Sequence, residues 1–424
     1  MKLKGLRWWI IGLIFIATVI NYIDRTAFAL LWPEMGKDLG MDHSDYAIML
    51  NIFMATYAIG KFASGKLYDQ IGTRLGFTVS IIVWSVASIL HAFARGLVSL
   101  SLFRGLLGLG EAGNWPGAVK SNGEWFPVKE RAIAQGIFNA GASIGNVIAP
   151  FVIVFLYAEF GWKTTYIILG IVGVLWVVPW LFINKAKPEH HSWLTDQERA
   201  LILKDRIKSK QVISSKEKGL SIRKILSYQQ SWGVLMCRFF FEPIWWFFVG
   251  WMPIYLANEF GLNIKETKTI WISYLMAAAG SILGGMFTGM LMKRMSVNWA
   301  RKITISVGGI LVLIAFVGII TLVNQSNFMT FIYLAGLALF GFQFAIGNIQ
   351  TISSDLFSGP SVGTLAGLAG TVAAVSPMIM NWFVGKITES SYTPAFVAIC
   401  ISVVLGVLSI FVLIKNIGAV KTSH

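Results

Sequence analysis

The chain has 424 residues, of which 56% are hydrophobic and only 13% are charged, about half the charged share of a typical soluble domain. A composition this apolar excludes a soluble globular protein and indicates a polytopic membrane protein. The net charge of +15 would suit a nucleic-acid partner, but the basic residues fall in short loops between apolar segments. They therefore indicate membrane topology, and no nucleic-acid binding is expected.

Apolar segments long enough to cross the hydrocarbon layer, about 20 residues each, occur twelve times. The predicted fold is therefore all-α and integral to the membrane, with twelve transmembrane helices in two six-helix bundles. The predicted helices are residues 8–31, 46–66, 75–95, 97–118, 132–157, 163–184, 230–257, 267–292, 302–323, 328–353, 361–386 and 392–415.

The basic residues alternate between the two sides of the membrane. Connections on the side of the termini carry 25 Lys and Arg, whereas the opposite connections carry 6. By the positive-inside rule, both termini are expected to be cytoplasmic. The polar stretch 185–229 separates bundles at 1–184 and 230–424, so it is predicted to be a cytoplasmic linker that meets anionic lipid. Within it, Leu194-Thr-Asp-Gln-Glu-Arg199 predicts a short helix with Thr195 as its N-cap.

Several ionisable side chains lie within the predicted spans, where a charge costs several kcal/mol unless it faces a water-filled cavity or a partner. They are Asp24, Arg25, Lys61, Arg104, Glu111 and Arg238, with Glu242 near the start of the seventh span as a further candidate. The first six comprise four cations and two carboxylates, which predicts an anionic substrate. Arginine suits this role because its planar guanidinium binds a carboxylate through two parallel hydrogen bonds.

The fourth span carries Arg104 and Glu111 seven residues apart. This is close to two helical turns, roughly 10 Å of rise, so both side chains share one face. We interpret that face as one wall of a solute pathway. The alternative is a buried structural ion pair that only holds helices together.

The first two spans add aromatic residues beside their charges. Tyr22 and Arg25 share a face of the first span, whereas Asp24 points about 100° away, toward another helix. On the second span, Tyr57 shares a face with Lys61. These faces are expected to line the pathway.

The loop after the second span carries a family motif. Gly65-Lys-Leu-Tyr-Asp69-Gln-Ile-Gly72-Thr-Arg74 resembles the Gly-x-Leu-x-Asp-x-x-Gly-x-Arg signature of the major facilitator superfamily. A weaker copy, Gly289-Met-Leu-Met-Lys293-Arg294, stands at the equivalent place of the second half. In that superfamily the loop locks the cytoplasmic side in the outward-facing state. The resemblance thus implies a conformational-gating role for Gly65, Asp69, Gly72 and Arg74.

Longer strings resemble the anion:cation symporter family and, within it, the branch of bacterial hexuronate transporters. They run from Arg104 to Pro116, from Glu124 to Arg131, from Phe138 to Pro150, from Glu242 to Pro253 and from Ser353 to Phe357. The resemblance covers essentially the whole chain. It implies the major facilitator fold and the inner membrane of a bacterial cell.

The resemblance also implies roles for particular residues. Arg25 and Tyr57 would bind substrate, Asp24 and Glu111 would couple to protons, Arg104 would pair with Glu111, and Arg238 would be the cation of the C-terminal half. Some hexuronate carriers lack the acid at the Asp24 position, so Glu111 is the stronger candidate for coupling. Lys61 stands where many relatives have Gln.

Further substrate contacts are expected from Tyr22 and from the cation Arg104. Trp245 and Trp246 are also candidates, because aromatic rings stack on a sugar-acid ring. Interfacial anchoring is the alternative for the two tryptophans. Lys61, Glu242, Gln343 and Asn348 are additional candidates, with internal salt bridges or interhelical hydrogen bonds as the alternative.

The leading hypothesis is a secondary transporter that imports a hexuronate or related sugar acid with H⁺, with Na⁺ as the alternative coupling ion. A negative cytoplasm opposes uptake of a monoanion by about 2.3 kcal/mol per 100 mV, which one proton cancels. Antiport of an organic phosphate for phosphate is the nearest alternative. A membrane sensor built on a transporter fold is the other, although we expect no output domain after the last span.

Catalytic and metal-binding motifs do not stand out in the sequence. The histidines and the two cysteines show no metal-ligand grouping, and neither a Walker lysine motif nor a nucleophile elbow occurs. We expect a monomer that is not an enzyme and that carries no cofactor or metal.

Overall fold

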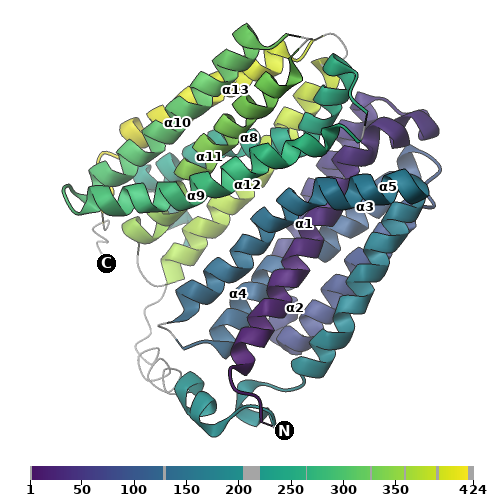
Figure 1. Ribbon diagram of the computed structural model, residues 1–424. Helices are drawn as coiled ribbons and strands as arrows, with labels where there is room; N and C mark the ends of the chain where they lie inside the picture. Colours follow the sequence, from purple (N-terminus) through teal and green to yellow (C-terminus); the bar gives the residue numbers. More distant parts are fainter. Residues whose placement is uncertain are drawn as a thin grey trace. The chain divides into compact units, whose positions relative to one another are not determined.

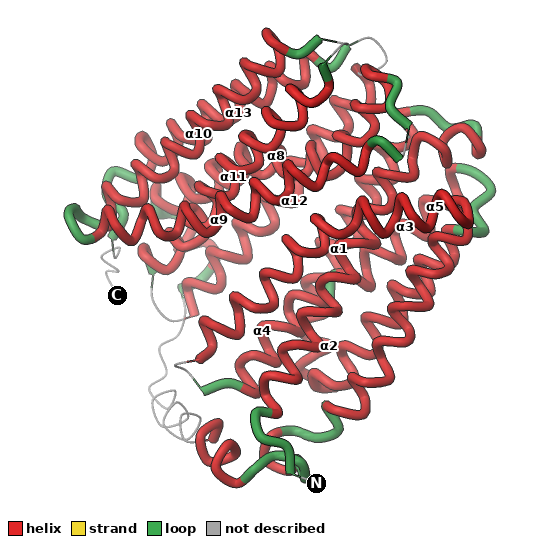
Figure 2. Tube along the Cα trace, in the orientation of Figure 1, coloured by secondary structure: helices red, strands yellow, loops and turns green. Residues whose placement is uncertain are grey.

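The computed structural model describes residues 2–127, 130–203, 220–263, 265–324, 327–357, 360–387 and 391–418. These residues form helices joined by loops, and the only β pairing described is the isolated bridge between Leu3 and Leu194 (Figures 1 and 2). The predicted all-α class is confirmed. The chain divides into two compact units, residues 1–216 and 217–424. Part of the predicted linker, residues 204–219, lies outside the described residues.

The first unit contains five long helices. They are α1 (Leu6–Leu39), α2 (His43–His91), α3 (Leu97–Glu111), α4 (Asn114–Trp125) and α5 (Arg131–Ile183). Gly72 and Gly161 adopt φ angles of 77° and 74° inside α2 and α5, which non-glycine residues rarely adopt, and each glycine turns its helix into two arms. The loop predicted between the second and third spans is thereby reduced to a corner at Gly72.

The fourth span was predicted to run unbroken over 97–118, but the structure interrupts it at Ala112 and Gly113 and continues it as α4. Pro116 explains the interruption. Proline has no backbone N–H, so the carbonyl of Ala112 receives no helical hydrogen bond from it.

The second unit contains α7 (Ile222–Leu226), α8 (Gln229–Phe260), α9 (Trp271–Met292), α10 (Val297–Leu322), α11 (Phe328–Leu356), α12 (Pro360–Ile387) and α13 (Thr393–Leu413). In the described part of the chain, ten helical stretches are long and apolar enough to cross a membrane. The stretch Gly136–Ile183 counts as one of these although it turns at Gly161. Neither α3 nor α4 is among the ten, but the two helices follow each other directly across the predicted fourth span. Divided in this way, the helices correspond to the twelve predicted spans.

Close packing in the first unit places α3 against both arms of α2, residues 43–71 and 73–91. A Cβ atom on Gly108 would lie 2.6 Å from the carbonyl oxygen of Phe53, and one on Gly110 would lie 2.6 Å from the backbone nitrogen of Trp84. Only glycine permits backbones to approach so closely. Figure 1 shows α1, in purple, running beside α5, and these two helices also pack extensively.

The start of the predicted linker is bound to the first unit. Residues 196–203 are helical, and Thr195 Oγ1 accepts a hydrogen bond from the backbone N–H of Glu198 at 3.3 Å, which confirms the predicted N-cap. The Glu198 carboxylate in turn accepts the backbone N–H groups of Gly5 and Leu6 and binds Arg7 at 2.7 Å. The N-terminus of α1 is therefore capped by a residue nearly 200 positions away in sequence.

Candidate functional site

A buried ion pair joins α1 to α3 in the first unit. Arg25 donates from Nη2 and Nε to the same carboxylate oxygen, Oε2 of Glu111, at 2.7 Å and 3.0 Å. Asn21 lies one turn before Arg25, and its Oδ1 atom accepts a further hydrogen bond from Nη2 at 3.3 Å. Arg25 is 6% exposed and Glu111 is 0% exposed. A charge-assisted pair at this depth stays intact unless both groups find other partners.

The predicted pairing of Arg104 with Glu111 is wrong. Glu111 binds Arg25 instead, because two helical turns separate it from Arg104 on their own helix while α1 brings Arg25 within hydrogen-bonding distance. Arg104 lies between two aromatic rings, with its Cζ atom 4.1 Å from the ring centroid of Phe28 and 4.6 Å from that of Phe53. No described residue accepts a hydrogen bond from its Nε or Nη1 atoms. Arg104 is thus a buried cation whose charge is balanced mainly by aromatic faces.

Aromatic rings also surround Arg25. Its Cζ atom lies 5.0 Å from the ring centroid of Tyr22, 4.9 Å from that of Tyr57 and 5.5 Å from that of Phe53. The structure therefore brings together Tyr22 and Arg25, as their spacing on the first span predicted, and adds Tyr57 from the second span. Lys61 extends this group, with its Nζ atom 4.6 Å from the Tyr57 ring centroid, but its side chain is otherwise exposed.

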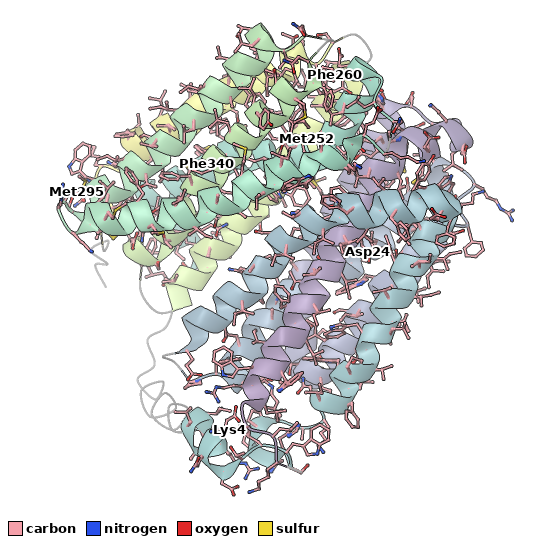
Figure 3. The ribbon with its side chains drawn as sticks, viewed as in Figure 1. Lys4, Asp24, Met252, Phe260, Met295 and Phe340 are labelled. Carbon is pink, nitrogen blue, oxygen red and sulfur yellow. The ribbon has the colours of Figure 1, made fainter. Side chains whose placement is uncertain are left out.

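Asp24 faces away from this group, toward the second arm of α2 (Figure 3). Ser88 donates a hydrogen bond to its Oδ1 atom at 3.2 Å, and Asp24 is 1% exposed. The predicted sideways orientation of Asp24 is confirmed. No Lys or Arg among the described residues lies within ion-pairing distance of it.

The gating motif lies at the corner between the arms of α2. Gly72 forms the corner itself, and Arg74 follows it, donating to the backbone carbonyl of Leu181 at 3.4 Å. The Arg74 carbonyl accepts a hydrogen bond from Trp180 Nε1 at 2.9 Å. Gly65 lies within the first arm, and the side chain of Asp69 lies outside the described residues.

The second unit holds its own cavity, of about 240 Å³. It is lined by Val234, Arg238, Ile349, Gln350, Ser353, Ala366 and Ala369, from α8, α11 and α12. Arg238 also faces Glu242 one turn along α8, with Nη2 and Oε2 3.2 Å apart. The cation predicted for this half therefore lies on a cavity, and a carboxylate balances its charge. Gln350 and Ser353 in this cavity were not among the predicted contacts.

Other residues predicted in the second unit lie apart from this cavity lining. Trp245 stacks on Phe342 with ring centroids 5.9 Å apart, and Trp246 and Gln343 are half-buried. Asn348 accepts hydrogen bonds from Arg301 at 2.8 Å and from Thr288 at 2.9 Å. It therefore ties α9, α10 and α11 together, which is the structural alternative considered for it.

Sequence reasoning missed several neighbours of the charged residues. Phe28 and Phe53 gave no signal, because phenylalanine is expected throughout apolar spans. His91 is a polar residue inside a span and was weighed only for metal binding, whereas Ser88, which is also polar and inside a span, was not considered. Among the described residues, no three His, Cys, Asp or Glu side chains come together in a way that would hold a metal ion.

Comparison with known proteins places the chain among transporters. Residues 14–381 match the family model described as Major Facilitator Superfamily. The chain is 31% identical to the hexuronate transporter of Escherichia coli (strain K12), with 100% of this chain and 97% of that protein covered. It is 33% identical to the galacturonate transporter of Dickeya chrysanthemi, over 74% of this chain and 90% of the relative.

A solved structure shows the same fold. A bacterial homolog of the human lysosomal transporter Spinster, in an inward-facing and occupied conformation, superposes with a TM-score of 0.74 over 98% of both chains. Its sequence identity to this chain is 16%, so the likeness concerns the fold alone. Together with the matches in sequence, it confirms the predicted family and fold.

Proposed function

The chain belongs to the major facilitator superfamily of multi-pass membrane transporters, and we propose that it imports a hexuronate or related sugar-acid anion by proton symport through alternating access. The similarity to hexuronate and galacturonate transporters supports this substrate class. We place the protein in the inner membrane of a bacterial cell, with both termini cytoplasmic.

The observation that carries the proposal is the relation of two arginines to one carboxylate. Arg25 binds Glu111, whereas no carboxylate in the described part of the chain binds Arg104. Removing one partner of a buried ion pair destabilises a protein by about 3–5 kcal/mol, because the other charge is left buried without compensation. Substrate carboxylate therefore supplies a partner that Arg104 lacks, or takes the place of Glu111 on Arg25.

Proton coupling follows from the same exchange. If a substrate carboxylate takes Arg25, Glu111 is left buried without its cation, and binding a proton removes the charge that would otherwise be stranded. Substrate binding and proton binding then favour each other. Asp24 is the second proton carrier in the proposal, because it is a buried carboxyl group with a hydrogen bond from Ser88 and no ion pair among the described residues.

The aromatic residues support recognition of a sugar ring. Tyr22 and Tyr57 offer ring faces and hydroxyl groups close to the Arg25 guanidinium. In the second unit, Arg238, Gln350 and Ser353 supply polar groups to a cavity, which suits a hydroxyl-rich ligand.

Transport by purified protein in proteoliposomes tests this function. The panel contains glucuronate, galacturonate and galactarate, with glucose as the neutral control and glucose 6-phosphate as the phosphate alternative. We expect counterflow of a sugar acid and its accumulation under an inward proton gradient in Na⁺-free buffer. Counterflow of glucose 6-phosphate alone would favour the antiporter. A strict requirement for Na⁺ would show that Na⁺, and not H⁺, is the coupling ion.

A further inference from the structure

The first unit contains a second group of buried polar side chains, distinct from the Arg25–Glu111 pair. Asp24 from α1, Ser88 and His91 from the second arm of α2, and Tyr166 from the second arm of α5 form it. The Ser88 hydroxyl lies 3.2 Å from Asp24 Oδ1 and 3.4 Å from the backbone carbonyl of Tyr166. The rings of His91 and Tyr166 stack with centroids 4.9 Å apart.

The hydrogen bond of His91 fixes how its ring is protonated. Its Nδ1 atom lies 2.7 Å from the backbone carbonyl oxygen of Ala87. A carbonyl only accepts hydrogen bonds, so Nδ1 carries the hydrogen and Nε2 of the neutral ring is a free acceptor. His91 is 0% exposed, and no described residue contacts its Nε2 atom through a hydrogen bond.

Three further groups in the cluster have polar atoms without a partner among the described residues. These atoms are Oδ2 of Asp24, the hydroxyl of Tyr166, and Nε and Nη1 of Arg104. Buried polar atoms are nearly always hydrogen-bonded in native proteins, and exceptions point to a functional role or to an exchangeable partner. This group of residues thus offers a carboxyl group, an imidazole acceptor and a hydroxyl group, which are the chemical types that hold and exchange a proton.

The charges that face this cluster come from α1 and α3. Arg104 and Glu111 of α3 act on Asp24, and Ser88 is its hydrogen-bond donor from α2. Arg104 also acts on His91 and, together with Asp24, on Tyr166. An anion that binds Arg104 therefore changes the electrostatic potential at all three proton-bearing groups at once.

We propose that His91 and Tyr166 serve the second coupling proton, the one held at Asp24. Tyr166 is a positioning residue that stabilises the Asp24 carboxylate when the proton leaves, and His91 relays the proton. This inference rests on the proposed function. In the step itself, the O–H bond at Asp24 Oδ2 breaks and the proton passes to solvent or to another carboxylate. The Tyr166 hydroxyl then donates to the ionised Asp24, and His91 Nε2 accepts and releases the proton in transit, so its ring is neutral before and after.

The test uses three variants of the full chain in proteoliposomes. Tyr166→Phe removes only the hydroxyl, and His91→Phe keeps a ring to stack on Tyr166. Tyr255→Phe removes the hydroxyl of another buried tyrosine, on α8 of the second unit, and serves as the matched control. Counterflow of glucuronate, accumulation under a proton gradient, and the pH profile of uptake are measured on the same vesicles.

We expect Tyr166→Phe and His91→Phe to keep counterflow within about twofold of wild type. Accumulation under the proton gradient should fall at least tenfold, the pH profile should shift, and Tyr255→Phe should behave as wild type. Unchanged accumulation and pH profile in both variants would overturn the inference. So would a parallel loss of counterflow, because that would place the residues in the substrate path. A wild-type protein that exchanges no sugar acid would instead refute the proposed function, and this inference with it.

Discussion

Glu111 binds Arg25 of α1 at 2.7 Å, and Arg104, on the same helix as Glu111, has no carboxylate partner among the described residues. Two arginines thus differ in what they can offer a substrate. Arg104 can accept an anion directly, whereas Arg25 accepts one only when Glu111 gives up its position. In the proposed mechanism, this asymmetry makes the protonation of Glu111 depend on the substrate.

Replacement of Arg25 by lysine tests the geometry of the guanidinium. Lysine keeps the positive charge but loses the planar set of donors that bind a carboxylate from Nε and Nη2. Arg25→Lys should weaken binding of the sugar acid at least tenfold, about 1.4 kcal/mol. Calorimetric titration of the purified protein measures this affinity. Wild-type affinity in the variant would show that Arg25 does not bind the substrate carboxylate.

Stability should distinguish the two arginines. Arg25→Gln leaves Glu111 buried and unpaired, and is expected to destabilise the protein by about 3–5 kcal/mol. Arg104→Gln removes a cation for which the described residues provide no carboxylate partner, so stability should change by less than about 1 kcal/mol or increase. Unfolding of both variants in detergent provides the comparison. Equal destabilisation by the two substitutions would show that Arg104 is also paired.

The corner at Gly72 should be sensitive to any side chain. Its φ of 77° and ψ of 171° lie in a region that is essentially confined to glycine, so Gly72→Ala is expected to cost about 1–3 kcal/mol. Gly123→Ala is the matched control, because Gly123 is helical and no atom lies within 4 Å of an added Cβ. Thermal unfolding should show a loss for the first variant only. A stable Gly72→Ala protein would mean that the corner relaxes without strain.

His191 should make stability depend on pH. Burial lowers the pKa of this histidine below its ordinary value of 6.5. The Ile183 carbonyl accepts from Nε2 at 2.9 Å, and the backbone N–H of Trp193 donates to Nδ1 at 3.2 Å, a hydrogen bond that only the neutral ring can accept. Its contribution to folding is therefore complete above pH 6.5 and is lost as the pH falls below that value. His191→Gln should flatten the melting temperature between pH 7 and about pH 5. An unchanged slope would assign the dependence to other groups.

Much of the fold could be predicted because helix periodicity and hydrophobic length are local properties of the sequence. The sideways orientation of Asp24 and the N-cap at Thr195 are of this kind. The partner of Glu111 could not be predicted in this way, since spacing along one helix does not show which neighbouring helix comes closer. The role of Asn348 depended on Arg301, which the predicted boundary at residue 302 had placed in a loop.

The contacts around Arg104 were also beyond prediction. Phe28 and Phe53 reach it from two different helices, and His91 meets Tyr166 only because the second arms of α2 and α5 lie together. Such contacts join residues far apart in sequence, and neither residue of each pair carries a pattern that marks the other.

The central claim is that Glu111 carries the coupling proton by giving up Arg25. Glu111→Gln imitates the protonated acid permanently, so it removes net proton movement while leaving the substrate site open. Counterflow and uptake driven by a proton gradient are measured on the same proteoliposomes. We expect Glu111→Gln to retain counterflow near the wild-type rate and to lose accumulation against the substrate gradient. Accumulation equal to wild type would show that the proton is carried elsewhere and would contradict the account.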